Sequence, residues 1–331
     1  MIAAAGLDLL VGDPRWCPHP VIWMGWWIHK LRTPVEGWAG DDPRLLRLGG
    51  LLITLLLVLG SGLAGWGIER LAWQAGPLGW IGSLLLLISL ASALAARSLR
   101  DSVLSVIAAL PSAPGGEMAL ARQRLSWIVG RDTAGLDPPE ILRAAAETAS
   151  ENAVDGLFAP LFWMLVGAAL WQQGWTGVPG PLALAWAFKA SSTLDSMLGY
   201  RRGRLRWLGT AGARLDDVLT WIPCRLVMAT LPLVSRPWSL WHGLVQAADR
   251  DGAADPSPNA GRSQAIYAHC AGVQLGGTNR YRERQVSKPV LAAGQPPVDA
   301  AAVHRILKLS TRLELLWLLL ALGASCNPLQ R

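Results

Sequence analysis

Apolar stretches long enough to cross a bilayer alternate with short polar segments along this chain. A membrane-crossing helix needs about 20 apolar residues. The pattern predicts three clear spans, two further spans and one truncated first span, at 48–66, 77–96 and 156–175, at 218–234 and 303–324, and at 1–11. We therefore predict an all-α fold: a polytopic helical integral membrane protein in which 1–331 forms a single membrane-embedded domain.

The range 247–297 interrupts this pattern, because it is polar and rich in glycine, proline and arginine. Such a composition favours turns and irregular structure.

Basic residues flank the predicted spans 48–66 and 77–96 on their outer sides, whereas the connection between them holds only Glu69 and Arg70. Cytoplasmic loops carry the excess of Lys and Arg in membrane proteins. We therefore predict that 247–297 is a loop-rich cytoplasmic insert and that the active face is cytoplasmic.

Composition supports the membrane assignment. Of the 331 residues, 52% are hydrophobic and 16% are charged, and 18 are Trp. Soluble domains average about 25% charged residues, and Trp gathers at membrane–water interfaces. The net charge of +7 is typical of basic cytoplasmic loops, so we expect no nucleic-acid partner. The four cysteines lie far apart and form no CxxC pair, so neither a zinc site nor a disulfide framework is indicated.

The most informative polar feature is a stripe of charges that immediately precedes an apolar segment. Arg143, Glu147, Glu151 and Asp155 recur at every fourth position. At about 100° per residue, a step of four drifts by about 40°, so the four side chains share one helix face. Like charges at this spacing destabilise a helix by about 0.2–0.5 kcal/mol per pair. A divalent metal would offset this repulsion, a solvated helix face is the alternative, and we expect Arg143 to pair with Glu147.

Other polar clusters also interrupt the hydrophobic background. They combine carboxylates, hydroxyls, amides or basic groups beside apolar segments, and they contain Asp13 and His19, Arg131 and Asp132, Asn152, Lys189 with Thr193, Asp195 and Tyr200, Asp216 and Asp217, and Asn259. A lysine, hydroxyls and an aspartate together are the parts that hold a phosphoryl group and its metal. Plain turns, helix caps and a snorkelling lysine are the alternatives. No GxxxxGK[ST] sequence occurs, which disfavours a P-loop fold.

Six motifs in order carry a family resemblance that runs from Gly12 to about Leu320. They read GDPRWCPHPVIWMG, RDTAGLDPPEI, ETASENAVDGLFAPLFW, FKASSTLDSMLGY, ARLDDVLTWIPCRL and PSPNAGRSQAIYAHCAGVQLGG. Together they resemble the adenosylcobinamide-phosphate synthase family of cobalamin biosynthesis, of the CobD/CbiB type. Members of that family usually have a longer apolar segment before the first motif, so we expect the first span to be truncated here.

The resemblance implies a multi-pass enzyme of the bacterial inner (plasma) membrane. Such an enzyme joins the free carboxyl of adenosylcobyric acid to (R)-1-aminopropan-2-ol or its O-phosphate, giving adenosylcobinamide or adenosylcobinamide phosphate. It is an amide ligase that uses Mg²⁺ and ATP as co-substrate, and an acyl phosphate would be its intermediate. The lipid bilayer is an expected partner, and so are other late cobalamin-pathway membrane enzymes.

Site roles follow from this expected reaction. We expect Mg²⁺ to be held by carboxylates, namely Glu147, Glu151, Asp155, Asp216 and Asp217. The expected catalytic residues are Lys189, Asp195, Glu151 and Arg131. Of these, Lys189 and Arg131 would neutralise phosphoryl oxygens, and Asp195 or Asp13 would be the base or a second metal ligand. Substrate or phosphate contacts are expected from Asp13, His19, Asp132, Asn152, Thr193, Tyr200 and Asn259.

Three other functions compete with this interpretation. A membrane transporter of a corrinoid or an ion would use the same carboxylates, but the charges gather at span ends and no internal repeat is present. A CDP-alcohol phosphotransferase shares the Asp155–Gly156 pair, yet the Ala-Arg that should follow it is absent. A membrane scaffold for a biosynthetic complex is the third alternative.

Overall fold

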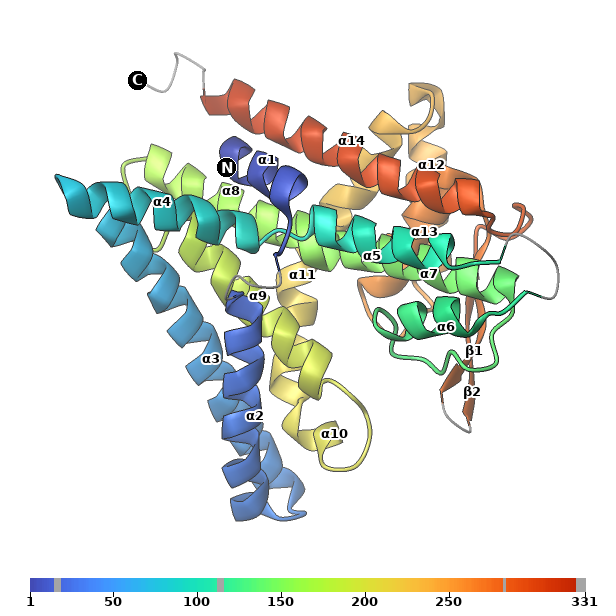
Figure 1. Ribbon diagram of the computed structural model, residues 1–331, viewed down its shortest axis with the longest axis horizontal. Helices are drawn as coiled ribbons and strands as arrows, with labels where there is room; N and C mark the ends of the chain where they lie inside the picture. The colour runs from blue at the N-terminus through green and yellow to red at the C-terminus, as the bar shows by residue number, and fades with distance from the viewer. Residues whose placement is uncertain (15–18, 112–115, 282–283, 326–331) are drawn as a thin grey trace. The chain divides into compact units, whose positions relative to one another are not determined.

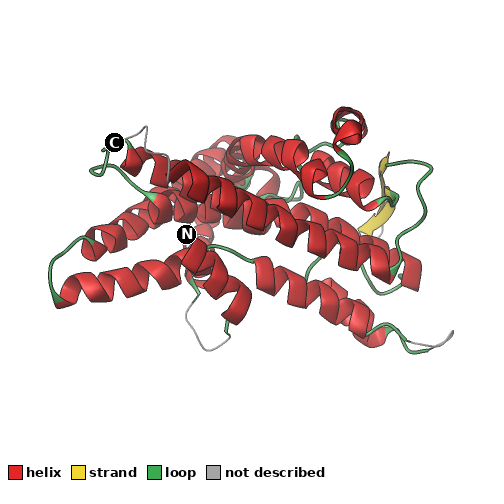
Figure 2. Cartoon of the chain, turned by 90° about the horizontal axis from the view of Figure 1, so that it is seen from above, coloured by secondary structure: helices red, strands yellow, loops and turns green. Residues whose placement is uncertain are grey.

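The computed structural model describes residues 1–14, 19–111, 116–281 and 284–325. Within these ranges the chain is mainly helical, with one two-stranded antiparallel hairpin (Figure 2). Four helices are long and apolar enough to cross a membrane: Pro43–Ala72, Pro77–Ala108, Pro138–Gln172 and Thr210–Val234. The predicted all-α membrane fold is confirmed.

These four helices include the ranges 48–66, 77–96 and 218–234 and most of 156–175. The range 303–324 is helical, within α14 (Ala300–Ser325), but it is not among the four. Four charged residues, Arg305, Lys308, Arg312 and Glu314, interrupt its apolar sequence. The first apolar stretch forms the ten-residue helix α1 (Ile2–Val11).

The chain divides into two compact units. The first unit comprises Met1–Ala95, Asp155–Thr220 and Leu320–Arg331, and the second comprises Ala96–Val154 and Trp221–Leu319. The division falls inside three of the four long helices, between Ala95 and Ala96, between Val154 and Asp155 and between Thr220 and Trp221. It also falls inside α14, between Leu319 and Leu320.

The first unit is a helical bundle. It contains α1, α2 (Pro20–Ala39), α3 (Pro43–Ala72), α4 (Pro77–Ser92), α8 (Ala159–Gln172), α9 (Pro181–Leu198), α10 (Leu205–Leu208) and the start of α11 (Thr210–Thr230). Helix α9 packs along α3 and α8, and α2 lies beside α3 (Figure 1). Gly65 permits the close approach of α3 and α9, because a Cβ there would lie 2.9 Å from the Cα of Ala183. Ile28, Ile53 and Leu194 lie in the buried core of this bundle.

The second unit combines shorter helices with the hairpin. It contains α5 (Ala96–Ala108), α6 (Ala119–Ser126), α7 (Pro138–Ala153), the 3₁₀ turns η2 (Leu231–Val234) and η3 (Trp238–Leu240), α12 (Trp241–Gly252), α13 (Ala260–Ala271), β1 (Leu275–Tyr281), β2 (Arg284–Leu291) and most of α14. Helix α7 begins with a capping box, in which Asp137 accepts from the Glu140 amide at 2.9 Å. Proline occupies its first turn, where a missing N–H costs nothing.

The prediction of a loop-rich insert at 247–297 is wrong for much of that range, which forms the end of α12, all of α13 and the hairpin. Its glycines lie between regular elements. Gly272, with φ of 69°, ends α13, and Gly276 and Gly277, with φ of 80° and 93°, lie where the register of β1 shifts. Glycine adopts these left-handed conformations without a Cβ penalty. A high glycine content therefore marked tight turns rather than a long irregular loop.

Candidate functional site

The charged stripe of α7 does not form one uniform face. A five-residue π-helix, η1 (Val154–Phe158), joins α7 to α8. It ends the regular α-helical spacing just before Asp155, and the boundary between the two units falls at the same point. Glu147 and Glu151 thus lie in the second unit and Asp155 in the first. A π-helical turn of this kind is often found at functional sites.

In the second unit, Glu147 is enclosed by two arginines. Its side chain is 4% exposed, and Arg131 and Arg143 beside it are 8% and 19% exposed. The Oε2 atom accepts from Arg131, and Oε1 accepts from Arg143 at 3.0 Å, which confirms the expected Arg143–Glu147 pair. The backbone N–H of Gly276 also donates to Oε1 at 3.0 Å. Both carboxylate oxygens are therefore used to hold the hairpin against α7.

Asn279 completes this network from strand β1. Its Oδ1 accepts from Arg131 and, at 3.0 Å, from Arg143. Arg143 also donates to the carbonyl oxygens of Gly276 and Thr278, at 2.8 and 3.0 Å. Arg131 and Glu147 are thus partners of each other and of the hairpin.

Glu151 lies one helical turn further along α7. Its Oε2 accepts from the side-chain amide of Gln264 at 2.6 Å. Lys288 lies 3.4 Å from the Oδ2 of Asp255. Lys288 thus acts on two carboxylates, those of Glu151 and Asp255.

The first unit holds a second group of charges, which we name the polar cluster: Asp155, Lys189, Asp195, Asp216 and Asp217. Asp155 and Asp216 both interact electrostatically with Lys189, and Asp195 and Asp217 interact with Asp216. Two aspartates from the N-terminal segment, Asp8 and Asp13, also act on Lys189. The ammonium group of Lys189 is thus under the electrostatic influence of four carboxylates, those of Asp8, Asp13, Asp155 and Asp216.

Lys189 lies on α9, beyond its apolar first half, and its side chain is mostly buried. Burial lowers the pKa of its ammonium group, while Asp13, Asp155, Asp8 and Asp216 act in the opposite direction. Asp216 carries a buried Oδ1 that has no hydrogen-bond partner among the residues that the structure describes. Within the same residues, no three His, Cys, Asp or Glu side chains converge as a metal-binding group.

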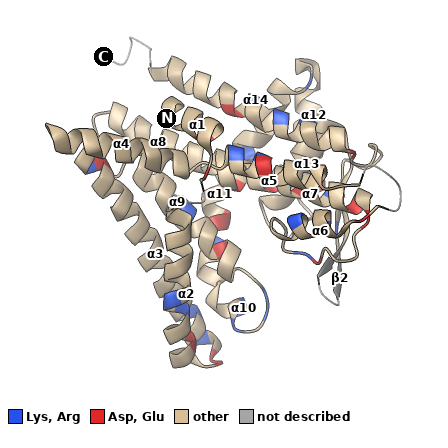
Figure 3. Ribbon diagram, viewed as in Figure 1, with Lys and Arg blue, Asp and Glu red and all other residues tan. Residues whose placement is uncertain are grey.

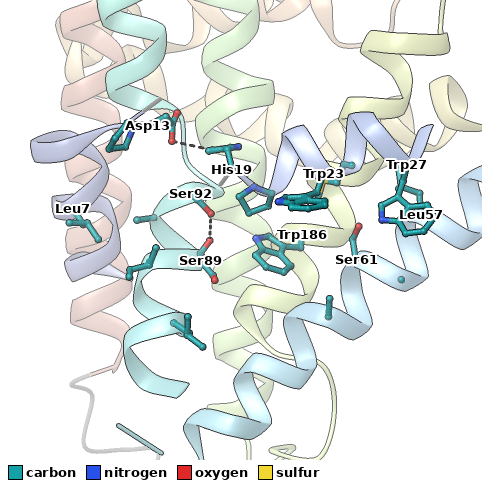
Figure 4. Close-up of a pocket in the computed structure, with 18 of the residues that line it drawn as sticks. Leu7, Asp13, His19, Trp23, Trp27, Leu57, Ser61, Ser89, Ser92 and Trp186 are labelled. Carbon is teal, nitrogen blue, oxygen red and sulfur yellow. Dashed lines mark hydrogen bonds and ion pairs between the residues drawn. The ribbon is translucent and has the colours of Figure 1, made fainter. Parts of the chain in front are cut away.

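Asp13 also belongs to a pair at the edge of a cavity. The Oδ1 of Asp13 lies 3.1 Å from the Nε2 of His19 (Figure 4). The other ring nitrogen of His19, Nδ1, accepts from the backbone N–H of Val21 and so caps α2. His19 thus caps α2 through Nδ1 and faces the Asp13 carboxylate with Nε2.

The cavity itself has a volume of about 990 Å³ and lies in the first unit. Its walls are mainly apolar and come from α1, α2, α3 and α4, with Trp186 from α9 (Figure 4). Trp23 and Trp27 line it, and Ser89 and Ser92 add hydroxyls. An apolar pocket with few polar groups at one end is the usual form of a small-molecule site.

Comparison with known proteins identifies the family. The family model for CobD/Cbib proteins matches residues 1–310. The chain belongs to this family. It is 42% identical over 323 residues to the cobalamin biosynthesis protein CobD of Geobacter metallireducens, with 97% of this chain and 94% of that protein covered.

Two further relatives of this CobD/Cbib chain extend the comparison. The cobalamin biosynthesis protein CobD of Synechocystis sp. is 41% identical over 318 residues, covering 96% of this chain and 88% of that protein. The cobalamin biosynthesis protein CbiB of Salmonella typhimurium is 36% identical over 323 residues, covering 97% and 95%. No solved structure matches the chain.

Several expected site residues of this CobD/Cbib protein lie outside the polar cluster. Asp132 is exposed and accepts from the Ala134 amide at 3.0 Å, which stabilises a turn. The Thr193 hydroxyl donates to the Lys189 carbonyl at 2.7 Å within α9. Tyr200 is exposed beneath the guanidinium group of Arg202.

Asn259 and Asn152 lie in the second unit with Glu147 and Glu151. The Oδ1 of Asn259 accepts from Arg225 at 2.6 Å, and Asn152 lies on the last turn of α7. Trp23 lines the cavity, and the indole N–H of Trp163 donates to the Leu219 carbonyl at 3.2 Å.

The structure also adds polar residues that sequence reasoning missed. Asp8 is 2% exposed within the apolar helix α1, and Asn279 is 3% exposed in the hairpin. The sequence could have indicated a role for Asp8, since a lone carboxylate in an apolar run is rarely buried without one. It gave no such indication for Asn279, because its partners Arg131 and Arg143 lie more than a hundred positions away in the sequence.

Proposed function

We propose that this protein catalyses amide-bond formation in cobalamin biosynthesis, at the cytoplasmic face of the bacterial inner membrane. The substrates are the free carboxyl of adenosylcobyric acid and (R)-1-aminopropan-2-ol or its O-phosphate. The products are adenosylcobinamide or its phosphate, ADP and inorganic phosphate. Membership of the CobD/Cbib family supports the pathway.

The observation that carries the reaction type is the polar cluster around Lys189. The cluster combines the mostly buried ammonium group of Lys189 with the carboxylates of Asp155 and Asp216, which act on it. It therefore supplies both the positive and the negative charges that phosphoryl chemistry needs. The cluster is linked to the cavity through Asp13, which lines the cavity and acts on Lys189. Trp23 and Trp27 in that cavity offer apolar faces for part of the corrinoid.

The residues fit Mg²⁺ that is shared with a substrate phosphate, but not a closed protein cage. Mg²⁺ usually keeps waters and takes one or two carboxylates together with phosphate oxygens. Asp216, with its unpartnered buried Oδ1, and Asp155 are the carboxylates proposed to hold it. Bound there, Mg²⁺ would supply charge neutralisation. We do not assign Glu147 to this role, because its two oxygens are already used by Arg131, Arg143 and Gly276.

In the proposed reaction, an oxygen of the corrinoid carboxylate attacks the γ-phosphorus of ATP and ADP leaves. Lys189 neutralises charge that develops on the phosphoryl oxygens. The amine then attacks the acyl carbon, and the acyl–oxygen bond breaks with release of phosphate. Asp195 takes the proton that the ammonium form of the amine must lose before it attacks.

The test is a reconstituted reaction. Purified full-length protein in lipid nanodiscs receives adenosylcobyric acid, Mg²⁺ and either amine, with and without ATP. Mass spectrometry follows the corrinoid product, and a coupled assay follows phosphate release. We expect product and phosphate in equal amounts and only with ATP. Ion or corrinoid flux across proteoliposomes without any amide product would overturn the proposal in favour of a transporter.

Variants connect the activity to the polar cluster. We expect Lys189→Ala and Asp216→Asn to lower kcat by at least about 100-fold, the range for loss of one preorganised charge. Lys308→Ala is the matched control, because Lys308 is exposed on α14. Wild-type rates in both cluster variants would remove the proposed roles.

A further inference from the structure

A dense group of basic side chains marks one end of the first unit. It lies where the end of α2 and the start of α3 meet α10 and its preceding loop (Figure 3). We name it the basic patch: Lys30, Arg32, Arg44, Arg47, Arg201, Arg202, Arg204 and Arg206. The same two segments, 29–48 and 199–207, contain only the carboxylates Glu36, Asp41 and Asp42.

These three carboxylates neutralise little of the patch. Glu36 pairs with Arg32 at 2.8 Å, and Asp41 pairs with Arg204 at 2.7 Å. Asp42 accepts from two backbone amides at the start of α3, so its charge stabilises the helix terminus. In the described part of the chain, no carboxylate lies within ion-pair distance of the other six basic residues, Lys30, Arg44, Arg47, Arg201, Arg202 and Arg206.

Aromatic rings hold several of these cations. The guanidinium carbons of Arg47 and Arg206 lie 4.5 and 4.9 Å from the ring of the same residue, Trp207. Two exposed arginines from different helices are therefore gathered at one indole. Lys30 lies 5.6 Å from the ring of Trp26 in the same way.

The backbone beneath Trp207 is tightly fixed. A Cβ on Gly50 of α3 would lie 1.9 Å from the carbonyl oxygen of Leu208, so the two backbones are in direct contact there. Leu205 and Leu208 are buried in the core shared by α2, α3 and α9. Arg47 and Arg206 are thus presented by rigid elements, which reduces the entropy lost when a ligand binds.

Next to the basic patch, the surface of the same helices is strongly apolar. Leu48, Leu51 and Leu55 of the membrane-spanning helix α3 are 47%, 44% and 47% exposed, and the rings of Trp26 and Trp38 on α2 are 45% and 58% exposed. The surface thus changes from exposed leucines, through tryptophans, to cations. This order matches a bilayer, in which the hydrocarbon core is followed by the interface and then by the charged headgroups.

We propose that the basic patch is a binding site for anionic phospholipid, with the lipid phosphate between Arg47 and Arg206 at Trp207. The acyl chains would lie along the exposed leucines of α3. Arginine binds phosphate oxygens through charge-assisted hydrogen bonds that are often bidentate, and a soluble anion would gain nothing from the adjoining apolar surface. This site is separate from the proposed reaction and does not depend on it.

The experiment measures lipid binding by the full-length protein. Detergent-solubilised protein is titrated with phosphatidylglycerol or with phosphatidylcholine, and bound lipids are counted by native mass spectrometry. We expect tighter binding of phosphatidylglycerol, weakened about fivefold by Arg47→Ala or by Arg206→Ala, as for loss of one cation near a membrane surface. The Arg47→Lys/Arg206→Lys variant keeps both charges but loses the planar guanidinium groups, so its binding should fall between that of the wild type and that of the alanine variants.

Matched controls separate this site from general charge effects. Arg100→Ala and Arg250→Ala remove exposed arginines of the second unit and should leave phosphatidylglycerol binding unchanged. Equal weakening by these controls, or equal affinity of the wild type for both lipids, would overturn the proposal. So would soluble glycerol phosphate that binds as tightly as phosphatidylglycerol. Circular dichroism and gel filtration confirm that each variant is folded.

Discussion

The carboxylate of Glu69, near the end of α3, accepts a hydrogen bond from the backbone N–H of Leu182 at 2.6 Å. It also accepts from the amides of Gly180 and Ala183, at 2.9 and 3.2 Å. One fully buried side chain thus satisfies the free N–H groups at the start of α9, the helix that carries Lys189.

We therefore expect Glu69→Ala to destabilise the protein by about 3 kcal/mol, because it leaves buried amide groups without acceptors. Thermal unfolding in detergent measures the effect. Asp42→Ala is the control, since Asp42 caps the exposed start of α3 and its loss should cost about 1 kcal/mol. A smaller loss for Glu69→Ala than for Asp42→Ala would contradict the buried cap.

Removal of Glu147 should be equally damaging in the second unit. Glu147→Ala leaves the buried guanidinium groups of Arg131 and Arg143 without their carboxylate, which costs about 3–5 kcal/mol. Hydrogen exchange should also become faster at the Gly276 amide, which now donates to Glu147. Unchanged protection at Gly276 would show that this network does not hold the hairpin.

Because the pKa of Lys189 is lowered, activity should be lost at a lower pH, on the alkaline side, than it would be with an ordinary lysine. Burial favours the neutral amine, so the proton is lost as pH rises through a pKa below the ordinary 10.5. Above that pH, Lys189 no longer neutralises phosphoryl oxygens and kcat falls. Lys189→Arg keeps its charge to higher pH, so its alkaline limb should move upward. The same limb in both proteins would assign the titration to another group.

Mg²⁺ should stabilise the protein through the polar cluster, independently of turnover. Asp216 is repelled by Asp155, Asp195 and Asp217. We expect Mg²⁺ to raise the Tm of the wild type, and Asp216→Asn to raise the metal-free Tm while reducing the response to Mg²⁺. Asp41→Asn, at an exposed ion pair, is the control and should respond like the wild type. An undiminished response in Asp216→Asn would exclude Asp216 as a ligand.

The sequence predicted the long apolar helices well, because hydrophobic length is a local property that the bilayer requires. It also predicted the Arg143–Glu147 pair, since residues four apart on a helix are neighbours. It failed on the hairpin at 275–291, where glycines that suggested an irregular loop instead allow left-handed turns and a register shift.

By itself, the sequence determined the membrane fold and the residue types available for chemistry. Only the tertiary structure decided which charges meet. In the sequence, the stripe from Glu147 to Asp155 looked continuous. In the structure, η1 and the boundary between the units separate the two residues: Glu147 forms ion pairs with two arginines, and Asp155 interacts electrostatically with Lys189. Helical periodicity fixes the face of a residue within one helix. The partners on that face come from distant segments, and packing alone selects them.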